Sequence, residues 1–129
     1  MPVLTLTLTT NGHNLLRDAL KGTDSAKVLY FALGSGTSTP TSAQTKLDAE
    51  SFRKAISSTS NGAGTGEALI NAYVAPNDAV GANIQEVGVF AGNSANSKAN
   101  TGVMMGRALW AHNPKTNLES ITLQLDMTV

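Results

Sequence analysis

A period-two alternation of apolar and polar side chains at both ends of the chain predicts β-strands there. Residues 3–10, VLTLTLTT, alternate apolar residues with threonine. Residues 119–129 place four apolar side chains on one face: Ile121, Leu123, Leu125 and Met127. Both segments also have a polar face in which threonine recurs, so we expect the first and the last strand to pair as neighbours.

Between these ends, short apolar runs separated by glycine-, asparagine- and proline-containing turns predict further strands. They cover residues 26–36, 52–58, 67–75, 83–91 and 103–113. The stretch 46–62 is ambiguous, because its Ala, Glu, Arg and Lys residues favour a helix by intrinsic propensity. We prefer a bend followed by a strand at 52–58, since SSTSNGAGTG after it is typical of a hairpin tip that leads into 67–75.

One helix is predicted, over residues 12–21, where Thr10 or Asn11 can cap the start and Gly22 can end it. Its apolar stripe consists of Leu15, Leu16, Ala19 and Leu20. With about seven strands and one short N-terminal helix, the expected fold is a mainly β single domain over residues 1–129. The expected packing is an antiparallel β-sandwich or a rolled sheet.

The charge content changes which partners we expect. Nine basic and nine acidic side chains give a formal net charge of zero, and charged residues make up only 14% of the chain. Nucleic-acid binders usually carry a basic surface, so no nucleic-acid partner is expected. A weakly charged surface protects a free monomer poorly, which favours a surface covered by other protein. An ordinary small neutral domain explains the composition equally well.

The N-terminal sequence MPVLTLTLTT has no basic segment and no long apolar run, so it is not typical of a signal peptide. No segment has the length of a transmembrane helix. We therefore expect a soluble protein made in a cytoplasm, with no membrane partner. The absence of cysteine excludes disulfides and thiolate metal sites.

Catalytic and metal-binding patterns are sparse. His13 and His112 lie far apart, and neither has a second ligand at metal-binding spacing. Paired-carboxylate catalysis by Asp48, Glu50 or Glu86 would need a cleft lined with aromatic residues. Aromatic residues make up 5% of the chain and lie mostly in strand patterns typical of a core. We therefore expect no cofactor, no metal and no enzymatic activity.

Glu86 is conspicuous because it lies inside the apolar strand predicted at 83–91. A carboxylate at such a position faces solvent, pairs with a cation or takes part in chemistry. We expect a structural ion pair, with Arg53 as the first candidate partner and Arg107 as the second, because a guanidinium group holds a carboxylate in a fixed geometry. Glu50, three residues before Arg53, belongs to the same expected set.

Several motifs in order resemble the N-terminal domain of phage tail-collar fibre proteins. TTNGHNLLRDAL matches a Thr/Asn-Gly stretch with a short helix, and YFALGSG matches a strand that ends in a Gly-x-Gly turn. Thr45, Leu47, Glu50 and Arg53 match a threonine-leucine-x-x-glutamate element followed by arginine. EVGVF at residues 86–90 matches a glutamate-apolar-glycine-apolar-phenylalanine strand, and TGVMMGRAL belongs to the same set. The resemblance covers nearly the whole chain.

The resemblance implies a non-enzymatic part of a bacteriophage virion tail that acts through protein–protein contacts, assembled in the host cytoplasm. The implied partners are other tail or baseplate proteins and further copies of the chain, with a trimer as the first guess because fibres are commonly threefold. In such fibres a shaft and a receptor-binding tip follow this domain, whereas this sequence stops at Val129. We therefore expect an adaptor, a baseplate or collar component, or a decoration protein.

One function of a different class stays open beside this one. The polar loops near residues 37–44 and 92–101 are also compatible with the contact surface of a small carbohydrate-binding module.

Overall fold

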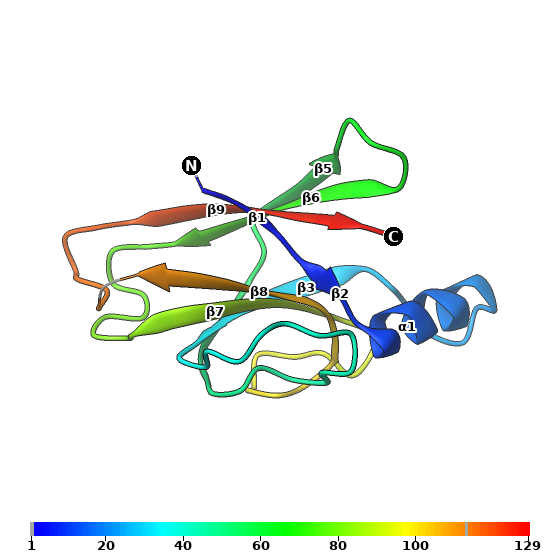
Figure 1. Cartoon of the computed structure of the whole chain (residues 1–129), viewed down its shortest axis with the longest axis horizontal. Coiled ribbons are helices and arrows are strands. Elements are labelled where there is room, and N and C mark those ends of the chain that lie inside the picture. The colour runs from blue at the N-terminus through cyan, green and yellow to red at the C-terminus, as the bar shows by residue number, and fades with distance from the viewer. Residues whose placement is uncertain (1, 113) are drawn as a thin grey trace.

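The chain folds into two β-sheets that pack face to face, with one helix at one end (Figure 1). The structure is a computed structural model and describes residues 2–112 and 114–129. These described residues form nine strands and one helix. The prediction of a mainly β sandwich is therefore confirmed, as two sheets and not as one rolled sheet.

The four-stranded sheet has the order β1-β9-β6-β5. β1 (Val3–Thr5) pairs in parallel with β9 (Ile121–Thr128), which confirms that the first and last strands are neighbours. β9 pairs antiparallel with β6 (Glu67–Val74), and β6 pairs antiparallel with β5 (Ser58–Asn61). A hairpin does lead into β6, as expected, but its first strand is β5, which lies within the segment expected as the tip, and not the strand expected at 52–58.

The five-stranded sheet has the order β2-β8-β7-β3-β4, and all its neighbouring strands are antiparallel. Its strands are β2 (Thr7–Leu8), β3 (Val28–Gly34), β4 (Glu50–Ala55), β7 (Ile84–Ala91) and β8 (Val103–His112). The strand expected at 103–113 corresponds to β8, and its last residue lies outside the described residues.

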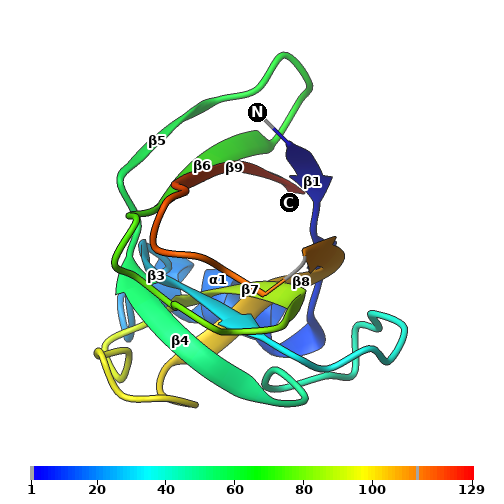
Figure 2. The same ribbon diagram turned by 90° about the vertical axis from the view of Figure 1, so that its left-hand side faces the viewer.

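Two predicted strands are each divided between the sheets, which is why the structure has more strands than the sequence predicted. The strand expected at 3–10 becomes β1 and β2, because the chain passes from one sheet to the other at Leu6, whose side chain is buried in the core. The strand expected at 52–58 ends at Ala55 in β4, and the chain then crosses to β5. Viewed along the sandwich, the two crossings lie on opposite sides (Figure 2).

The helix α1 (Thr10–Leu20) begins two residues before the predicted segment, because neither candidate cap is the actual one. The cap is Thr9, whose hydroxyl accepts a hydrogen bond from the N–H group of Gly12 at 2.9 Å. Of the predicted apolar stripe, Leu15 is buried in the core, whereas Leu20 at the last turn is 90% exposed. The helix therefore contacts the sandwich through its first two turns.

The main core lies between the sheets, and a second cluster lies on the outer face of the five-stranded sheet. All four apolar side chains predicted on one face of the last strand are buried in the main core. The second cluster consists of Ala32, Leu47, Phe90 and Met104. Two loops cover it: residues 35–49, the first cover loop, and residues 92–102, the second cover loop (Figure 1).

Candidate functional site

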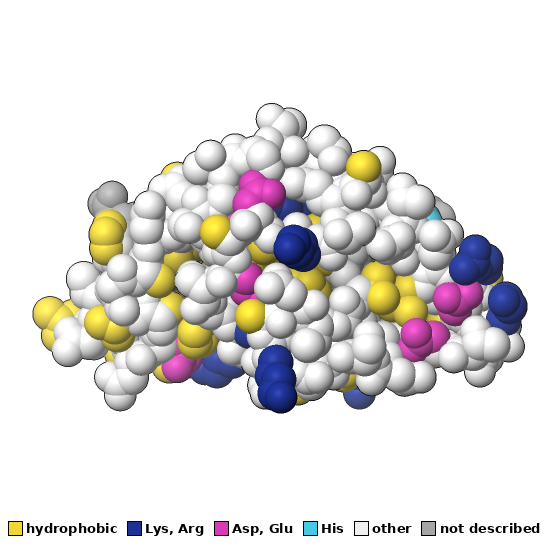
Figure 3. Space-filling view, turned by 90° about the horizontal axis from the view of Figure 1, so that it is seen from below, with side chains coloured by type: hydrophobic (Ala, Val, Ile, Leu, Met, Phe, Trp, Pro, Cys, Tyr) yellow, Lys and Arg dark blue, Asp and Glu magenta, His cyan; other side chains and the backbone are white. Residues whose placement is uncertain are grey.

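Two buried arginine–carboxylate pairs lie between the outer face of the five-stranded sheet and its two cover loops. Seen from below, this side of the molecule is a mostly uncharged surface with scattered cations and anions (Figure 3). The two ion pairs lie beneath this surface and consist of the residues that the sequence singled out.

Glu86 in β7 is fully buried and accepts hydrogen bonds from four donors. Nε of Arg107, in the neighbouring strand β8, donates to Oε1 at 2.9 Å. Three backbone N–H groups of the first cover loop donate as well: Gly36 and Ala49 to Oε2 at 2.8 Å each, and Asp48 to Oε1 at 2.9 Å. A carboxylate has about four acceptor sites, so this one is saturated.

Arg107 is as buried as Glu86 and binds the first cover loop with its remaining donors. Nη1 donates to the carbonyl oxygen of Ser38 at 2.7 Å and to Oε1 of Gln44 at 3.3 Å. Nη2 donates to Oδ2 of Asp48 at 3.1 Å. Hydrogen bonds from Ser38, and to a smaller extent the charge of Arg107, hold the pKa of Asp48 below its usual value. One guanidinium group therefore joins β7, β8 and the loop.

Glycine is required where the first cover loop leaves β3. A Cβ atom on Gly34 would lie 2.5 Å from the carbonyl oxygen of Ala49 and 2.6 Å from Oε2 of Glu86. A Cβ atom on Gly36 would lie 2.5 Å from the same Oε2. Real Cβ atoms do not approach that closely, so the Gly-Ser-Gly turn lets the backbone close over the carboxylate.

The second pair joins Glu50 and Arg53, both in β4. Nε and Nη2 of Arg53 donate to the two oxygens of Glu50 at 2.8 and 2.9 Å, and the side chains are only 2% and 1% exposed. The guanidinium group lies 4.0 Å from the centre of the Phe90 ring. Its Nη1 donates to the carbonyl oxygens of Thr101 at 2.7 Å and Asn96 at 3.2 Å. This pair therefore holds the second cover loop on the sheet.

The structure corrects the expected partner of Glu86. Arg53, the first candidate, is wrong, and Arg107, the second, is confirmed. The sheet order supplies the reason, because β7 lies next to β8 while β3 separates it from β4. The four predicted residues thus form two pairs, Glu86–Arg107 and Glu50–Arg53, on one face of one sheet.

Trp110, His112 and Glu119 form a further cluster that the sequence analysis missed. The rings of Trp110 and His112 stack with their centres 5.1 Å apart, and Nε2 of His112 lies 3.1 Å from Oε1 of Glu119. Hydrogen bonds from the N–H group of Thr116 and then from His112 lower the pKa of Glu119. Two ring side chains two residues apart share one face of a strand, so their spacing was an available signal. The expectation of core aromatics is wrong for Tyr73, which is 41% exposed.

Lys115 is a further residue whose place the sequence did not reveal. Its side chain is buried, and Nζ donates to the carbonyl oxygens of Ala75, Pro76 and Thr116 at 3.0, 3.0 and 2.9 Å. All three N–H donors of the ammonium group are therefore used. Lys115 ties the loop before β9 to the turn after β6.

The two ion pairs hold backbone and loops in place and leave no reactive oxygen free on Glu86. Within residues 2–112 and 114–129, no group of three or more His, Asp or Glu side chains is arranged to hold a metal ion. Nor does that part of the chain contain a helix with the length and apolar character needed to cross a bilayer. The pairs Glu86–Arg107 and Glu50–Arg53, together with Gly34 and Gly36, form one structural unit, which we call the buried clasp.

Comparison of the chain with known protein families, with curated proteins and with solved structures found no match.

Proposed function

We propose that the protein is a non-enzymatic structural component of a bacteriophage virion tail, in the fibre, baseplate or collar region. It acts through contacts with other tail or baseplate proteins. One observation carries this proposal: residues from the separate motifs behind the family resemblance lie side by side in the buried clasp.

Gly34 and Gly36 come from YFALGSG, Glu50 and Arg53 from TKLDAESFRK, and Glu86 from EVGVF. Arg107, from TGVMMGRAL, completes the first ion pair. When residues from motifs far apart in the sequence form one structural unit, that unit explains why the motifs occur in the same chain. Their convergence supports a common origin with the family that carries them in the same order.

The chemistry of the clasp supports a structural role. A general acid or nucleophile needs a free oxygen within reach of a substrate. Glu86 is buried with four donors, and Glu50 is held by two hydrogen bonds from Arg53 beneath a loop. Removing one partner of such a pair leaves a buried charge uncompensated, so the pairs specify one arrangement of sheet and loops.

The test is made on particles. Phage tails purified from cells that produce this chain are expected to contain it at a fixed copy number, measured by mass spectrometry and by imaging of intact particles. Recovery of the chain only as free protein, with none in purified tails, would refute the proposal. A glycan array with the isolated chain separates the alternative, because saturable binding of one sugar would favour the carbohydrate-binding module.

A further inference from the structure

One side of the sandwich carries a cavity beside an unpaired strand edge. On that side β5 is the edge of the four-stranded sheet and β4 is the edge of the five-stranded sheet, and Ile56 and Ser57 join them. A cavity of about 490 Å³ opens between the sheets there. Its wall is mainly aliphatic and includes Leu16, Val28, Ile70, Met105, Met127 and Val129.

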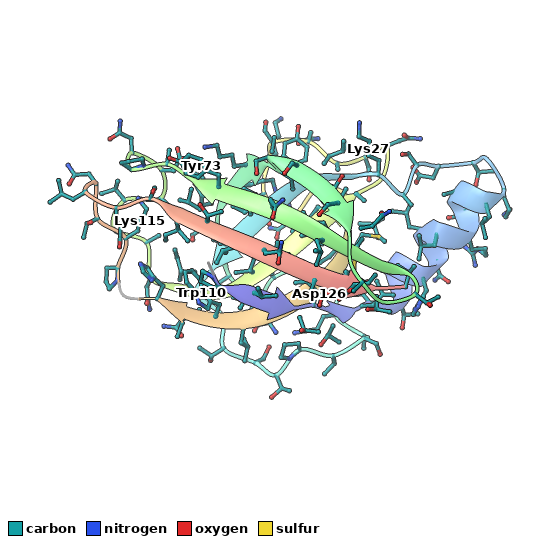
Figure 4. All side chains as sticks on the ribbon, turned by 90° about the horizontal axis from the view of Figure 1, so that it is seen from above. Lys27, Tyr73, Trp110, Lys115 and Asp126 are labelled. Carbon is teal, nitrogen blue, oxygen red and sulfur yellow. The ribbon has the colours of Figure 1, made fainter. Side chains whose placement is uncertain are left out.

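Polar residues border this cavity only at a few positions. Ser57, Ser58 and Thr59 line it from β5 and the segment before it, and Lys27 is the one charged residue among the described residues that line it. Lys27 lies just before β3 and is labelled in Figure 4. The cavity therefore suits apolar side chains that enter beside β5.

On the outer side of β5, the backbone groups have no hydrogen-bond partner among residues 2–112 and 114–129. Viewed from above, β1 and β5 lie at opposite edges of the four-stranded sheet (Figure 4). The N–H group of Gly62 donates to the carbonyl oxygen of Glu67 at 2.9 Å, and bonded pairs alternate along an antiparallel ladder. Ser58 and Ser60 therefore face β6 with their backbone groups. The backbone groups of Thr59 and Asn61 point to the free edge.

β5 is short, with four residues, but it lacks the charges, prolines and bulges that usually protect an edge strand. Charged side chains, prolines, bulges and very short length keep edges from pairing with other chains. The sequence of β5 is Ser-Thr-Ser-Asn, all four residues are exposed, and its register with β6 is regular. By contrast, the edge strand β4 carries three charged residues and the edge strand β1 has three residues.

We propose that a strand of a partner protein adds to the free edge of β5 and places apolar side chains, at every second position, in the cavity. Main-chain hydrogen bonds to Thr59 and Asn61 would hold the strand, and the cavity would select its side chains. A second copy of β5 would be a poor occupant, because Ser, Thr and Asn leave an aliphatic cavity unfilled. The inference deepens the proposed function and rests on it only in taking a protein as the occupant.

The probe is a displayed library of random heptapeptides selected on the purified full chain. We expect the recovered peptides to carry apolar residues at alternating positions. A synthetic copy of a recovered peptide should slow hydrogen exchange at the N–H groups of Thr59 and Asn61. The N–H groups of Ser58 and Ser60 should change little, because β6 already binds them.

Three variants make the test specific. Thr59→Pro removes an outward N–H group without removing a bond to β6, and we expect peptide affinity to fall about tenfold or more. Ala68→Leu fills part of the cavity, which Ala68 lines, and should weaken binding to a similar degree. Thr5→Pro is the matched control: Leu6 donates to Asp126 of β9, so in β1 the N–H group of Thr5 points outward at the opposite edge. The peptide affinity of Thr5→Pro should therefore equal that of the wild type.

Failure to enrich alternating apolar peptides, or binding that survives both Thr59→Pro and Ala68→Leu, would overturn the inference. If Ala68→Leu abolishes peptide binding and Thr59→Pro does not, strand addition is overturned, and the cavity takes a small apolar ligand in place of a strand. Self-association that Thr59→Pro abolishes would indicate a second copy as the occupant. The peptide selection and the tail assay fail independently. The chain can occur in purified tails without selecting peptides, and it can select peptides without occurring in tails.

Discussion

Glu86 and Asp126 are both carboxylic acids inside strands, and their surroundings differ. Glu86 accepts hydrogen bonds from Arg107 and three backbone N–H groups. Asp126, labelled on β9 in Figure 4, faces another carboxyl group, that of Glu67. The hydrogen bond with Glu67, then desolvation and the charge of Glu67, raise the pKa of Asp126. Backbone hydrogen bonds from Gly64, and then the side chain of Asp126, lower the pKa of Glu67.

We predict that Glu86→Gln lowers the free energy of unfolding by about 3–5 kcal/mol, because buried Arg107 loses its buried counter-charge and keeps only Asp48, whose side chain is 35% exposed. Denaturant titration measures the change. The control is Asp18→Asn, which removes the exposed ion pair with Arg17 and should cost less than about 1 kcal/mol. The structural role fails if Glu86→Gln folds and assembles normally while a hydrolase activity of the wild type on host-envelope polysaccharide disappears.

Asp126→Asn is predicted to stabilise the protein at neutral pH. A raised pKa in the folded state means that Asp126 adds stability at low pH and that this contribution is lost as pH rises through the folded-state pKa. Asparagine resembles the protonated form, so its advantage should appear above pH 3.8, the ordinary pKa of the group, grow as the pH rises through the folded-state pKa of Asp126, and stay constant above it. Melting temperatures of both proteins across the pH range measure it. An equal difference at every pH would contradict the assignment.

At the scale of elements, each arginine clasps a different loop to the five-stranded sheet. Arg53 binds carbonyl oxygens of the second cover loop, and Arg107 binds groups of the first. The loops are long and polar, yet their positions depend on side chains from strands. Each loop should therefore loosen separately when its own arginine is changed.

Arg53→Lys keeps the charge but loses the two-point contact with Glu50 and the stacking on Phe90. We predict faster hydrogen exchange in the second cover loop, while the first keeps its wild-type rates. Arg107→Lys is the reciprocal control and should loosen the first cover loop. Uniform acceleration in both loops by either variant would mean that the loops are not held independently.

The turn that ends β3 is predicted to tolerate no side chain at its first glycine. Gly34→Ala should destabilise the fold by more than about 1 kcal/mol, because its Cβ atom would meet the Ala49 carbonyl oxygen as well as Glu86. Gly64→Ala is the control: its nearest neighbours would lie at 3.6 Å or more, and its φ is not left-handed. That variant should be neutral or stabilising by up to about 1 kcal/mol. Equal melting temperatures for the two variants would contradict the prediction.

At the scale of the whole molecule, the sandwich has a clasped side and an open one. The cover loops close the outer face of the five-stranded sheet, whereas the cavity beside β5 opens on the β4–β5 side. Few charges lie on the surface, and 14% of all residues are charged. These features favour a protein that works inside an assembly.

We predict that the working form is an oligomer, with a trimer as the first guess. An obligate interface should bury well over about 2,000 Å² in total. Sedimentation at micromolar concentration measures the state of the purified chain, and imaging of particles measures it in place. A stable monomer that also has no partner in a virion would count against this prediction.

The sequence by itself determined the strand class, the buried face of β9, the presence of a hairpin before β6 and the residues of the ion pairs. These features are local, because side-chain alternation and turn chemistry act between residues close in the chain. A charged residue in an apolar strand also predicts a counter-charge nearby, because burying an unpaired charge is costly. None of this needs the positions of distant elements.

Only the tertiary structure decided which arginine binds Glu86, where two strands divide, which threonine caps α1 and where the cavity lies. Arg53 and Arg107 are equivalent in the sequence, and the order of strands in the sheet separates them. Leu6 continues a perfect alternation, yet the chain changes sheets there because β1 and β2 pair with different strands. Thr9 caps the helix while it is buried against β8. Each of these depends on contacts between segments far apart in the chain, which local patterns do not encode.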